Sequence, residues 1–321
     1  MQPKVHALGR KLAIIATMSF SKALFSEKLQ PVIRENVILA EYSTFQIGGP
    51  ADLFAEPDNI EDLILLIAEA KQQAIPSFIL GGGSNTLFHD NGFRGLIIHP
   101  NLKKIEINGE NIRAESSIPV AQLLQKAIAS NLAGMEGWIG LPGSVGGAIR
   151  GNAGASGVET KDLLESAEIF DQQTGKIEKK FTKELDFDYR DSIFKKNPTL
   201  IILAGTWKFH KVEDAKAMQA TMTEILKKRN QTQPKGKSAG CIFKNPAPGI
   251  SAGKLIDESG CKNVQKGDIQ ISSVHGNFFL NHGKGTQKDA LELIHETQKI
   301  VKQKTGYDLH TEIEMLPENP F

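Results

Sequence analysis

The sequence predicts an α+β fold in two domains, and three observations support it. A chain of 321 residues is long enough for two domains with an ample core. Helix-like and strand-like patterns both recur, and the polar segment Asn230–Ser238 divides them into a longer and a shorter part. The longer part contains the glycine-rich window Gly137–Gly157. We therefore expect an N-terminal extension without fixed structure over residues 1–30, a glycine-rich domain over 31–211 and a smaller domain over 212–321.

Periodicity predicts the elements of the first domain. Residues 58–73 predict a helix because apolar side chains recur at helical spacing, and Asp58 with Glu61 resembles a capping box. A second helix is expected between Ser117 and Gly134. Strands, two of them short and buried, and hairpins are expected at Ser77–Leu80, Leu96–His99, Ile105–Ile107 with Asn111–Glu115 around Asn108-Gly109, Ala167–Asp171 with Ile177–Phe181, and Thr199–His210.

Within residues 212–321 the first predicted element is a charged amphipathic helix over Asp214–Arg229. Beyond the polar boundary segment the patterns predict, in order, a helix at Ala252–Ser259, a strand at Asn277–Asn281, a helix at Gln287–Lys304 and a final strand at Leu309–Leu316.

The composition excludes several classes of protein. A net charge of +1, without blocks of like charge, argues against binding to nucleic acid or an anionic membrane, and no apolar run is long enough for a membrane span. Two cysteines in a chain of this size indicate a reducing compartment. The basic and apolar stretch after Lys11 only vaguely resembles a signal peptide. We expect a cytoplasmic monomer with a short leader or a start-site extension, Met18 being a candidate start.

Two glycine-rich loops predict contact with an anion. The window Gly137–Gly157 holds eight glycines and one long side chain, Arg150, and glycine at this density weakens both helices and strands. A second loop, Leu80–Asn85, follows an expected strand. Because backbone N–H groups in such loops approach phosphates closely, two loops favour a diphosphate ligand such as a dinucleotide. A flexible linker is the alternative, although linkers rarely contain residues such as Trp138.

Three short blocks carry candidate chemistry. Arg190 suits a bidentate bond to a carboxylate or phosphate, with a surface salt bridge as the alternative. Cys241 is a candidate nucleophile or proton donor, or else a small core residue. Glu312 and Glu314 are expected on one face of the final strand, with a solvated edge strand as the alternative. The blocks are Asp188–Ser192, Ser238–Pro246 and Leu309–Met315.

Several familiar sites do not fit the sequence. The histidines are scattered and no His/Cys spacing matches a zinc site, so no metal is predicted. Gly236-Lys237-Ser238 imitates the end of a P-loop, but residue 231 is glutamine where that motif needs glycine. Neither glycine loop matches the Rossmann fingerprint. A Ser-His-Asp triad stays open, although the sequence has no nucleophile-elbow pattern.

Six motifs, taken in order and at their separations, resemble one known family. They are Thr44–Asp52, Leu80–Asn85, Leu141–Gly147, Asn152–Gly154, Tyr189–Ser192 and Phe243–Pro246. Each is weak alone, but six in register resemble the UDP-N-acetylenolpyruvoylglucosamine reductases, the MurB family of FAD enzymes in bacterial cell-wall precursor synthesis. The resemblance runs from about Glu35 to Leu316.

The resemblance implies an FAD-binding domain of the vanillyl-alcohol-oxidase (PCMH) type, followed by a smaller α+β substrate-binding domain. It also implies that NADPH, as co-substrate, reduces FAD, and that hydride then passes to C3 of UDP-N-acetylglucosamine enolpyruvate. The product would be UDP-N-acetylmuramate, for peptidoglycan synthesis. The implied FAD-binding residues are Gly81, Gly82, Gly83, Ser84, Asn85, Gly143, Ser144, Gly146, Gly147, Asn152 and Gly154.

The resemblance also gives the three blocks catalytic roles. Arg190 matches the arginine that binds the substrate carboxylate and stabilises the enolate-like charge. Glu312 matches the glutamate that stabilises or protonates that intermediate. Cys241 stands where many members carry the serine that protonates C2, which departs from the commonest pattern. Because the ordinary pKa of a thiol is about 8.5, we predict that Cys241 donates this proton without special activation.

Three further residues match polar substrate contacts of the family: Asn245, Lys262 and His275. Lys262 suits the UDP diphosphate, and His275 has a buried structural role as an equal alternative. No tyrosine lies between Arg190 and Cys241, so the chain should belong to the subclass without a tyrosine lid. The competing interpretations are a flavin oxidoreductase of the same fold, acting on a hydroxy acid or sugar lactone, and a nucleotide-binding or scaffold protein that has lost the chemistry.

Overall fold

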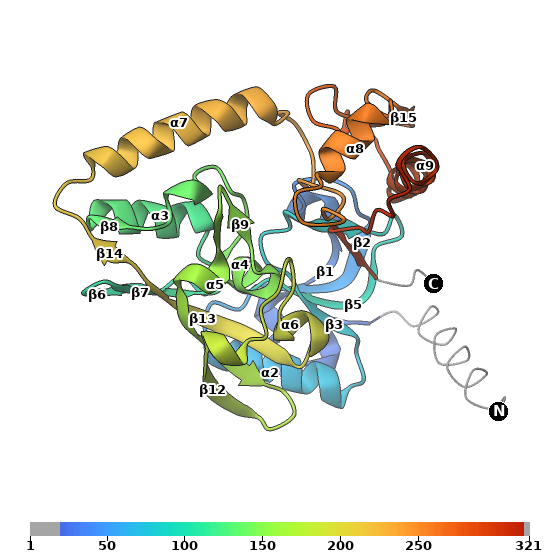
Figure 1. The fold of residues 1–321 in the computed structure, drawn as a ribbon. Coiled ribbons are helices and arrows are strands. Elements are labelled where there is room, and N and C mark those ends of the chain that lie inside the picture. Colours follow the sequence, from blue (N-terminus) through green and yellow to red (C-terminus); the bar gives the residue numbers. More distant parts are fainter. Residues whose placement is uncertain (1–19, 318–321) are drawn as a thin grey trace, which may run out of the picture.

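The computed structural model describes residues 20–317 and shows a mixed fold of helices and strands, which confirms the predicted α+β class (Figure 1). The helices are α2 (Ile60–Gln72), α3 (Val120–Ala129), α4 (Val145–Gly151), α5 (Thr160–Leu163), α6 (Ile193–Lys196), α7 (Lys216–Thr232), α8 (Ala252–Glu258) and α9 (Gln287–Thr305). The strands are β1 (Ile33–Ile38), β2 (Pro50–Ala55), β3 (Ser77–Ile79), β4 (Thr86–Phe88), β5 (Phe93–Ile98), β6 (Ile105–Asn108), β7 (Asn111–Glu115), β8 (Leu132–Ala133), β9 (Gly154–Ala155), β10 (Val158–Glu159), β11 (Leu164–Asp171), β12 (Lys176–Phe181), β13 (Leu200–Lys208), β14 (His210–Lys211), β15 (Gln265–Lys266), β16 (Ile269–Ile271), β17 (Phe279–Asn281) and β18 (Glu314–Leu316).

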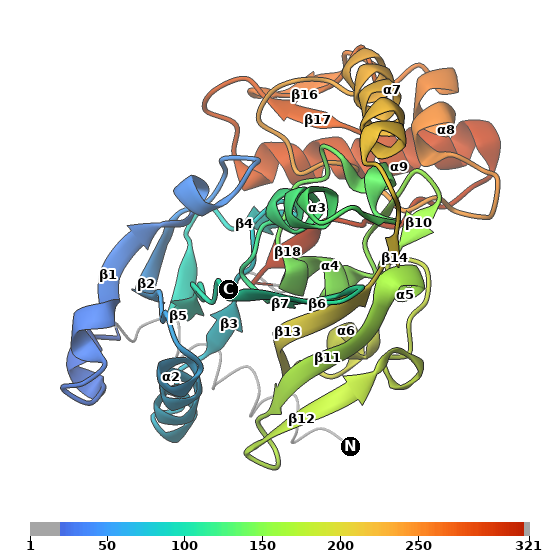
Figure 2. The ribbon, with the colours of Figure 1, turned by 90° about the vertical axis from the view of Figure 1, so that its left-hand side faces the viewer.

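Two larger sheets dominate the first half of the molecule (Figure 2). One has the order β1-β2-β5-β3, with β2, β5 and β3 parallel, and α2 packs against it through buried residues such as Leu63 and Leu66. The other is antiparallel, with the order β12-β11-β13-β7-β6. It packs on α3 and α4 around Trp138 and Trp207, whose rings meet edge to face at 5.7 Å. The predicted hairpin over residues 105–115 is confirmed, but its two turn residues are 109 and 110.

The C-terminal part packs onto the first half rather than standing apart. β15, β16 and β17 form a small antiparallel sheet that shares a core with α8 and α9. Phe45, Ile47 and Leu87 of the first half lie in the same core. The last strand, β18, crosses back and pairs in parallel with β4, directly after the first glycine loop. The C-terminal segment therefore reaches the glycine loops.

α7 bridges the two halves and buries little of its surface. In Figure 1 it runs across the top of the molecule, from the side of α3 toward α8 and α9. Met218 is buried and Met222, Ile225 and Arg229 are half-buried, one turn apart on a single stripe, while the other faces are exposed. This stripe places Arg229 over the loop that contains Gly140, whose carbonyl accepts a hydrogen bond from Arg229 Nη2 at 3.0 Å.

Four sequence expectations are corrected. The N-cap of α2 is Asn59, whose side chain accepts from the Asp62 N–H, so the capping pair lies one residue later than predicted. α7 continues into the polar boundary segment and ends at Thr232. The glycine window contains a short helix, α4, because its Ser144 cap and buried Val145, Ala148 and Ile149 favour it. The final strand begins only at Glu314, so Glu312 precedes it.

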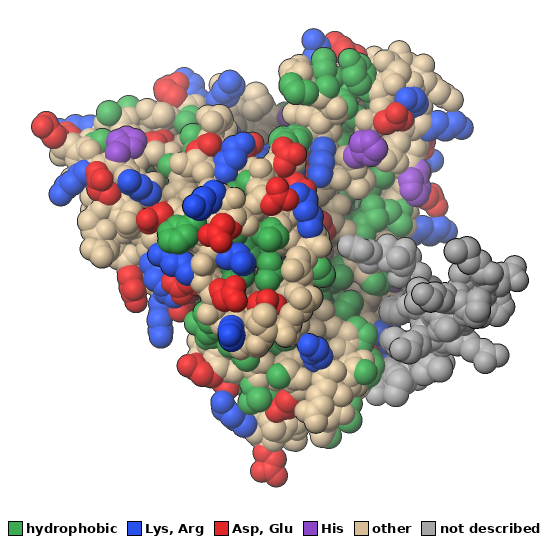
Figure 3. All heavy atoms as spheres, turned by 60° about the horizontal axis from the view of Figure 1, so that its bottom comes forward, with side chains coloured by type: hydrophobic (Ala, Val, Ile, Leu, Met, Phe, Trp, Pro, Cys, Tyr) green, Lys and Arg blue, Asp and Glu red, His purple; other side chains and the backbone are tan. Residues whose placement is uncertain are grey.

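The N-terminal extension expected over residues 1–30 falls partly outside the described residues, as does the predicted leader. Residues 20–30 are described, and Phe25 and Leu29 are buried against the α2 core. Within residues 20–317 no helix is both long and apolar enough to cross a membrane, and no cluster of His, Cys, Asp or Glu is suited to a metal ion. Figure 3 shows acidic and basic side chains interspersed over one face of the molecule.

Candidate active site

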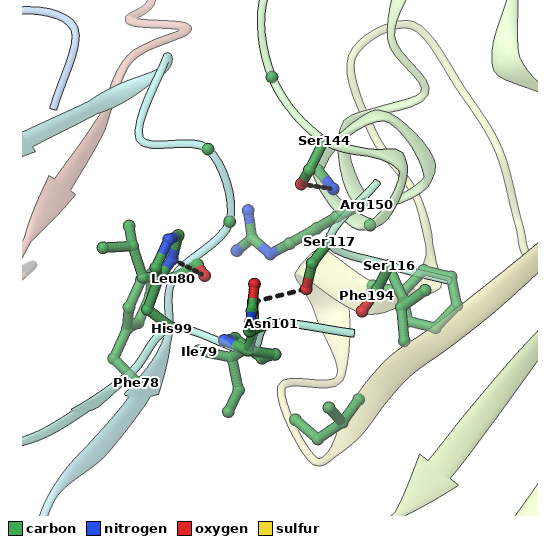
Figure 4. A pocket seen from close by; sticks show the side chains of 18 of the residues that line it. Phe78, Ile79, Leu80, His99, Asn101, Ser116, Ser117, Ser144, Arg150 and Phe194 are labelled. Carbon is green, nitrogen blue, oxygen red and sulfur yellow. Dashed lines mark hydrogen bonds between the residues drawn. The ribbon is translucent and has the colours of Figure 1, made fainter. Parts of the chain in front are cut away.

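A cavity of about 560 Å³ is lined in part by residues of both predicted glycine loops (Figure 4). This volume is within the ~300–1,000 Å³ that ligand pockets occupy. Phe78 and Ile79 of β3 line one wall, which explains why this strand is half-exposed although the sequence predicts a buried one. Six of the predicted cofactor-binding residues also line the cavity: Gly81, Gly82, Gly143, Ser144, Gly146 and Gly147.

The absence of side chains lets the two glycine loops touch. A Cβ on Gly82 would lie 3.0 Å from the Cα of Gly143, and a Cβ on Gly81 would lie 3.1 Å from Ser144 Oγ. Gly143 itself has a φ of +107°, which favours glycine. The loops therefore form one continuous wall of bare backbone, suited to close approach by a phosphate-containing ligand.

Three other predicted cofactor residues belong to the first glycine loop but do not line the cavity. Gly83 has a φ of +60°, and a Cβ there would lie 1.8 Å from the Tyr42 carbonyl oxygen, so the position shapes the loop. Ser84 contacts the second loop, since a Cβ on Gly143 would lie 3.1 Å from Ser84 Oγ. Asn85 donates from Nδ2 to the Glu312 carbonyl oxygen at 3.0 Å, which joins the loop to the C-terminal segment.

Asn152 and Gly154 contribute to the neighbouring site instead of the cavity wall. The fully buried Asn152 amide donates to Glu159 Oε2 and to the Asp188 carbonyl, at 3.0 and 2.9 Å. It therefore fixes the turn that presents Arg190. The Gly154 carbonyl accepts from Arg190 Nη2 at 3.4 Å.

Arg190 and Glu312 form the centre of this second site. Arg190 Nε donates to Glu312 Oε1 at 2.7 Å, and both side chains are largely buried. Asp188 and Asp191 close a tight turn through two backbone hydrogen bonds, and Arg190 adopts a φ of +56° inside it. This conformation is strained for a residue other than glycine, and strained residues of this kind are often found at functional sites. Arg190 therefore does form a salt bridge, as the alternative expected, but the pair is mostly buried instead of lying on the open surface.

Cys241 lies within electrostatic reach of both residues. Burial and the Glu312 carboxylate raise the pKa of the Cys241 thiol to about 12, against opposing effects of Arg190, Arg229 and a hydrogen bond with Asn277. The thiol is therefore a weaker acid than the sequence suggested, since burial outweighs the two arginines. At neutral pH it is protonated. The three predicted catalytic residues, from three distant segments, are brought together.

The three predicted substrate residues gather around α8. Asn245 Oδ1 accepts from the Ala252 N–H at 3.0 Å, just where α8 begins. His275 packs so closely against Gly253 that a Cβ there would lie 2.7 Å from its ring. Lys262 follows α8 and pairs with Asp257 at 2.7 Å. Burial first, and the Lys262 charge second, lower the pKa of His275, so its imidazole is neutral at pH 7.

Sequence reasoning missed two arginines at these sites. Arg150, at the end of α4, lines the cavity and pairs with Glu314, which also binds Lys195 at 3.1 Å. Arg150 is the one long side chain of the glycine window, and this feature of the sequence could have marked it as a candidate ligand contact. Arg229 of α7 lies beside Cys241, and no local pattern distinguishes it from the other basic residues of that helix.

Comparisons with known proteins match both halves of the chain. Residues 51–179 match the family model of an FAD binding domain, and residues 231–316 match that of the UDP-N-acetylenolpyruvoylglucosamine reductase C-terminal domain. The reductase of Clostridium novyi (strain NT) is 38% identical over 307 residues, covering 95% of this chain and 99% of the relative. That of Protochlamydia amoebophila (strain UWE25) is 40% identical over 292 residues, covering 90% and 96%.

A solved structure agrees with these matches. The crystal structure of UDP-N-acetylenolpyruvylglucosamine reductase (MurB) from Thermus caldophilus superposes with a TM-score of 0.76 at 35% identity, covering 88% of this chain and 99% of that one. The C-terminal domain match and the full-length relatives name the same family that the six motifs resemble. The chain therefore belongs to the UDP-N-acetylenolpyruvoylglucosamine reductase family.

Proposed function

We propose that the chain is an FAD-dependent reductase that uses NADPH to convert UDP-N-acetylglucosamine enolpyruvate to UDP-N-acetylmuramate. The observation that carries this is the convergence of Arg190, Glu312 and Cys241 into one site. A hydrogen bond from Asn85 connects that site to the loop lining the cavity. Cofactor and substrate can therefore meet at the junction of the two halves.

The cavity fits FAD on its own geometry. The two touching glycine loops offer backbone without side chains, the β3 wall is apolar, and Arg150 adds a cation. When bound, FAD supplies the hydride relay between NADPH and the substrate. The residues proposed to hold it are the cavity-lining members of the predicted set, with Gly83, Ser84 and Asn85 shaping the loop behind them.

Arg190 is proposed to bind the substrate carboxylate. Its guanidinium is already oriented by Glu312 and by the Gly154 carbonyl, so little rearrangement is needed when the substrate arrives. A fixed cation at this position stabilises the negative charge that develops as hydride reaches C3 of the enolpyruvyl group. Glu312 holds the guanidinium in place and supplies a second polar group to the reacting carbons.

Cys241 is proposed to give a proton to C2. Its raised pKa keeps the thiol protonated, which is the state that a donor needs. Arg190 and Arg229 stabilise the thiolate that remains after the transfer, because both oppose the effect of burial on that pKa. The carbon gains its proton from the Cys241 S–H bond, and the electron pair of that bond stays on sulfur.

Asn245, Lys262 and His275 are proposed to hold the UDP part. The side-chain oxygen of Asn245 accepts a hydrogen bond from the first N–H of α8. Its side-chain NH₂ group is left for the substrate. Lys262 offers a cation for the diphosphate. The protein is further proposed to act as a cytoplasmic monomer in peptidoglycan synthesis, and thus in cell-wall biogenesis, cell shape and division. Its two free cysteines support a reducing compartment.

An anaerobic visible spectrum of the purified protein tests the proposal. The flavin bands should bleach on addition of NADPH and return only when UDP-N-acetylglucosamine enolpyruvate is added. Bands that return with oxygen but not with the enolpyruvyl sugar would indicate an oxidase of the same fold. A protein that binds no FAD on reconstitution would overturn the proposed function.

A further inference from the structure

The ion cluster of Arg150, Glu314 and Lys195 borders the cavity proposed for FAD, and only the charge of Arg150 has been used so far. Arg150 lies in the last turn of α4 and Lys195 in α6, while Glu314 begins β18. Arg150 Nη1 donates to Glu314 Oε1, and Lys195 Nζ lies 3.1 Å from the same oxygen. Two cations thus share one carboxylate, and the cluster keeps a net positive charge.

The position of Glu314 is fixed by the backbone. Its N–H donates to the Asn85 carbonyl at 3.0 Å, and in the β18–β4 ladder it pairs with Thr86. The carboxylate is only 29% exposed. Burial alone would raise its pKa, but the charges of Arg150 and Lys195 lower it overall, so the side chain is ionised at neutral pH.

The rest of the Arg150 guanidinium is available to a ligand. Within the part of the chain that the structure describes, Arg150 Nη1 donates a hydrogen bond to Glu314, whereas Arg150 Nε and Nη2 donate none to the protein. Figure 4 shows the side chain reaching from α4 into the cavity, toward Ser117 and the chain that follows Leu80. That chain is the Gly81–Gly82 loop, whose bare backbone is suited to phosphate oxygens.

Charge in the cavity favours an anion at this point. Lys103 is the second cation on the lining, and the carboxylate there, Glu56, is ion-paired with Arg34 at 2.5 Å. We propose that Arg150 binds the diphosphate of FAD and that Glu314, shared with Lys195, orients its guanidinium. This inference rests on the proposed function, because FAD is taken as the occupant.

Titration of flavin-free protein with FAD, followed by flavin fluorescence at several salt concentrations, tests the inference. Arg150→Met should weaken FAD binding by at least about 10-fold, as expected for loss of a charged hydrogen bond, and should reduce the salt dependence of the Kd. Glu314→Gln should also weaken FAD binding, although it removes a negative charge. Lys196→Met is the matched control, because Lys196 neighbours Lys195 on α6 but pairs with Asp186 and Asp191.

Each result decides one part of the inference. If Arg150→Met binds FAD like the wild type, or is weaker by an amount independent of salt, Arg150 does not contact the diphosphate. If Glu314→Gln binds FAD more tightly, Glu314 acts only as an opposing charge and does not orient Arg150. If Arg150→Met does not fold, the same titration is done with Arg150→Lys. This variant should also weaken FAD binding, because lysine lacks the planar set of donors of a guanidinium. Wild-type protein that binds no FAD would instead defeat the proposed function.

Discussion

Arg190 and Glu312 are joined by a 2.7 Å hydrogen bond across 122 positions of sequence. Two residues later Glu314 binds Arg150, so one C-terminal segment supplies a carboxylate to each of two arginines. One of these arginines lies at the candidate substrate site and the other at the cavity proposed for FAD. Closure of the fold by β18 therefore completes both sites together.

Replacement of Arg190 by methionine should lower kcat/KM for UDP-N-acetylglucosamine enolpyruvate by about 100-fold or more, the size expected for loss of one preorganised charge-stabilising group. Arg190→Lys should recover part of the lost kcat/KM, because lysine keeps the positive charge but cannot form the two parallel hydrogen bonds of a guanidinium. Steady-state kinetics of both variants provide the measurement. Arg113→Met is the control, since Arg113 is also paired with a glutamate, Glu168 at 2.6 Å, but lies on β7 and has no contact with Glu312 or Cys241 among the described residues. Equal losses in Arg190→Met and Arg113→Met would contradict a specific role.

Cys241→Ala should lower turnover of the enolpyruvyl sugar by about 100-fold to 10,000-fold, the range for removal of a general acid. Cys241→Ser should retain much more activity, because a hydroxyl replaces the thiol as donor. Cys261→Ala removes the other cysteine, which is buried in the C-terminal core, and should leave turnover near that of the wild type. Full turnover in Cys241→Ala would exclude the thiol as the proton donor.

The raised pKa of Cys241 predicts how its reactivity depends on pH. Burial holds the group as a thiol, and only the thiolate attacks iodoacetamide. In a Cys261→Ala background, the alkylation rate should rise about tenfold per pH unit, without a plateau below about pH 10. Mass spectrometry of the labelled protein follows the rate. A plateau near neutral pH would show that Arg190 and Arg229 outweigh burial, contrary to the structure.

The sequence predicts the local elements well because the signals that form them are local. Glycine density, helical periodicity and turn residues identify both loops, α8, α9 and the two hairpins, and the family resemblance singles out Arg190, Cys241 and Glu312 as candidates. The errors at element ends are also local: Asn59 replaces Asp58 as the cap because its side chain reaches the Asp62 N–H.

What the sequence does not predict depends on contacts between distant segments. Asn152 belongs to a family motif, but the motif does not show that its side chain donates a hydrogen bond to the Asp188 carbonyl. That bond depends on a turn 36 positions away in the sequence. Glu314 was expected beside Glu312 on one strand face, whereas β18 begins at Glu314 and each carboxylate meets a different arginine. The Cys241 pKa likewise follows from burial, which a motif does not encode.

Gly82→Ala should weaken FAD binding by about tenfold, because its Cβ would lie 3.0 Å from the Gly143 Cα and separate the loops, a strain of ~1–3 kcal/mol. Fluorescence titration with FAD measures this. Gly151→Ala, in the last turn of α4, is the matched control, since no atom lies within 4 Å of a Cβ there. Its FAD affinity should equal that of the wild type. Equal affinity in Gly82→Ala would show that the two loops need not touch.

Glu314 should make stability depend on acid pH. Its pKa is lowered in the folded protein, since Arg150 and Lys195 outweigh burial, so its stabilising contribution is present above the unfolded-state pKa of about 4.3 and disappears as the pH falls through the folded value.

Glu314→Gln should therefore lower the free energy of unfolding of the flavin-free protein by about 2 kcal/mol at pH 7, the size expected for breaking a partly buried ion pair. The difference from the wild type should shrink in urea denaturation at progressively lower pH, because protonation of Glu314 has the same effect as the substitution. Asp214→Asn is the control: its pair with Lys216 is exposed, so no comparable change is expected. A Glu314→Gln deficit that stays constant down to the acid transition would show that packing, not the charge of Glu314, stabilises β18 against α4.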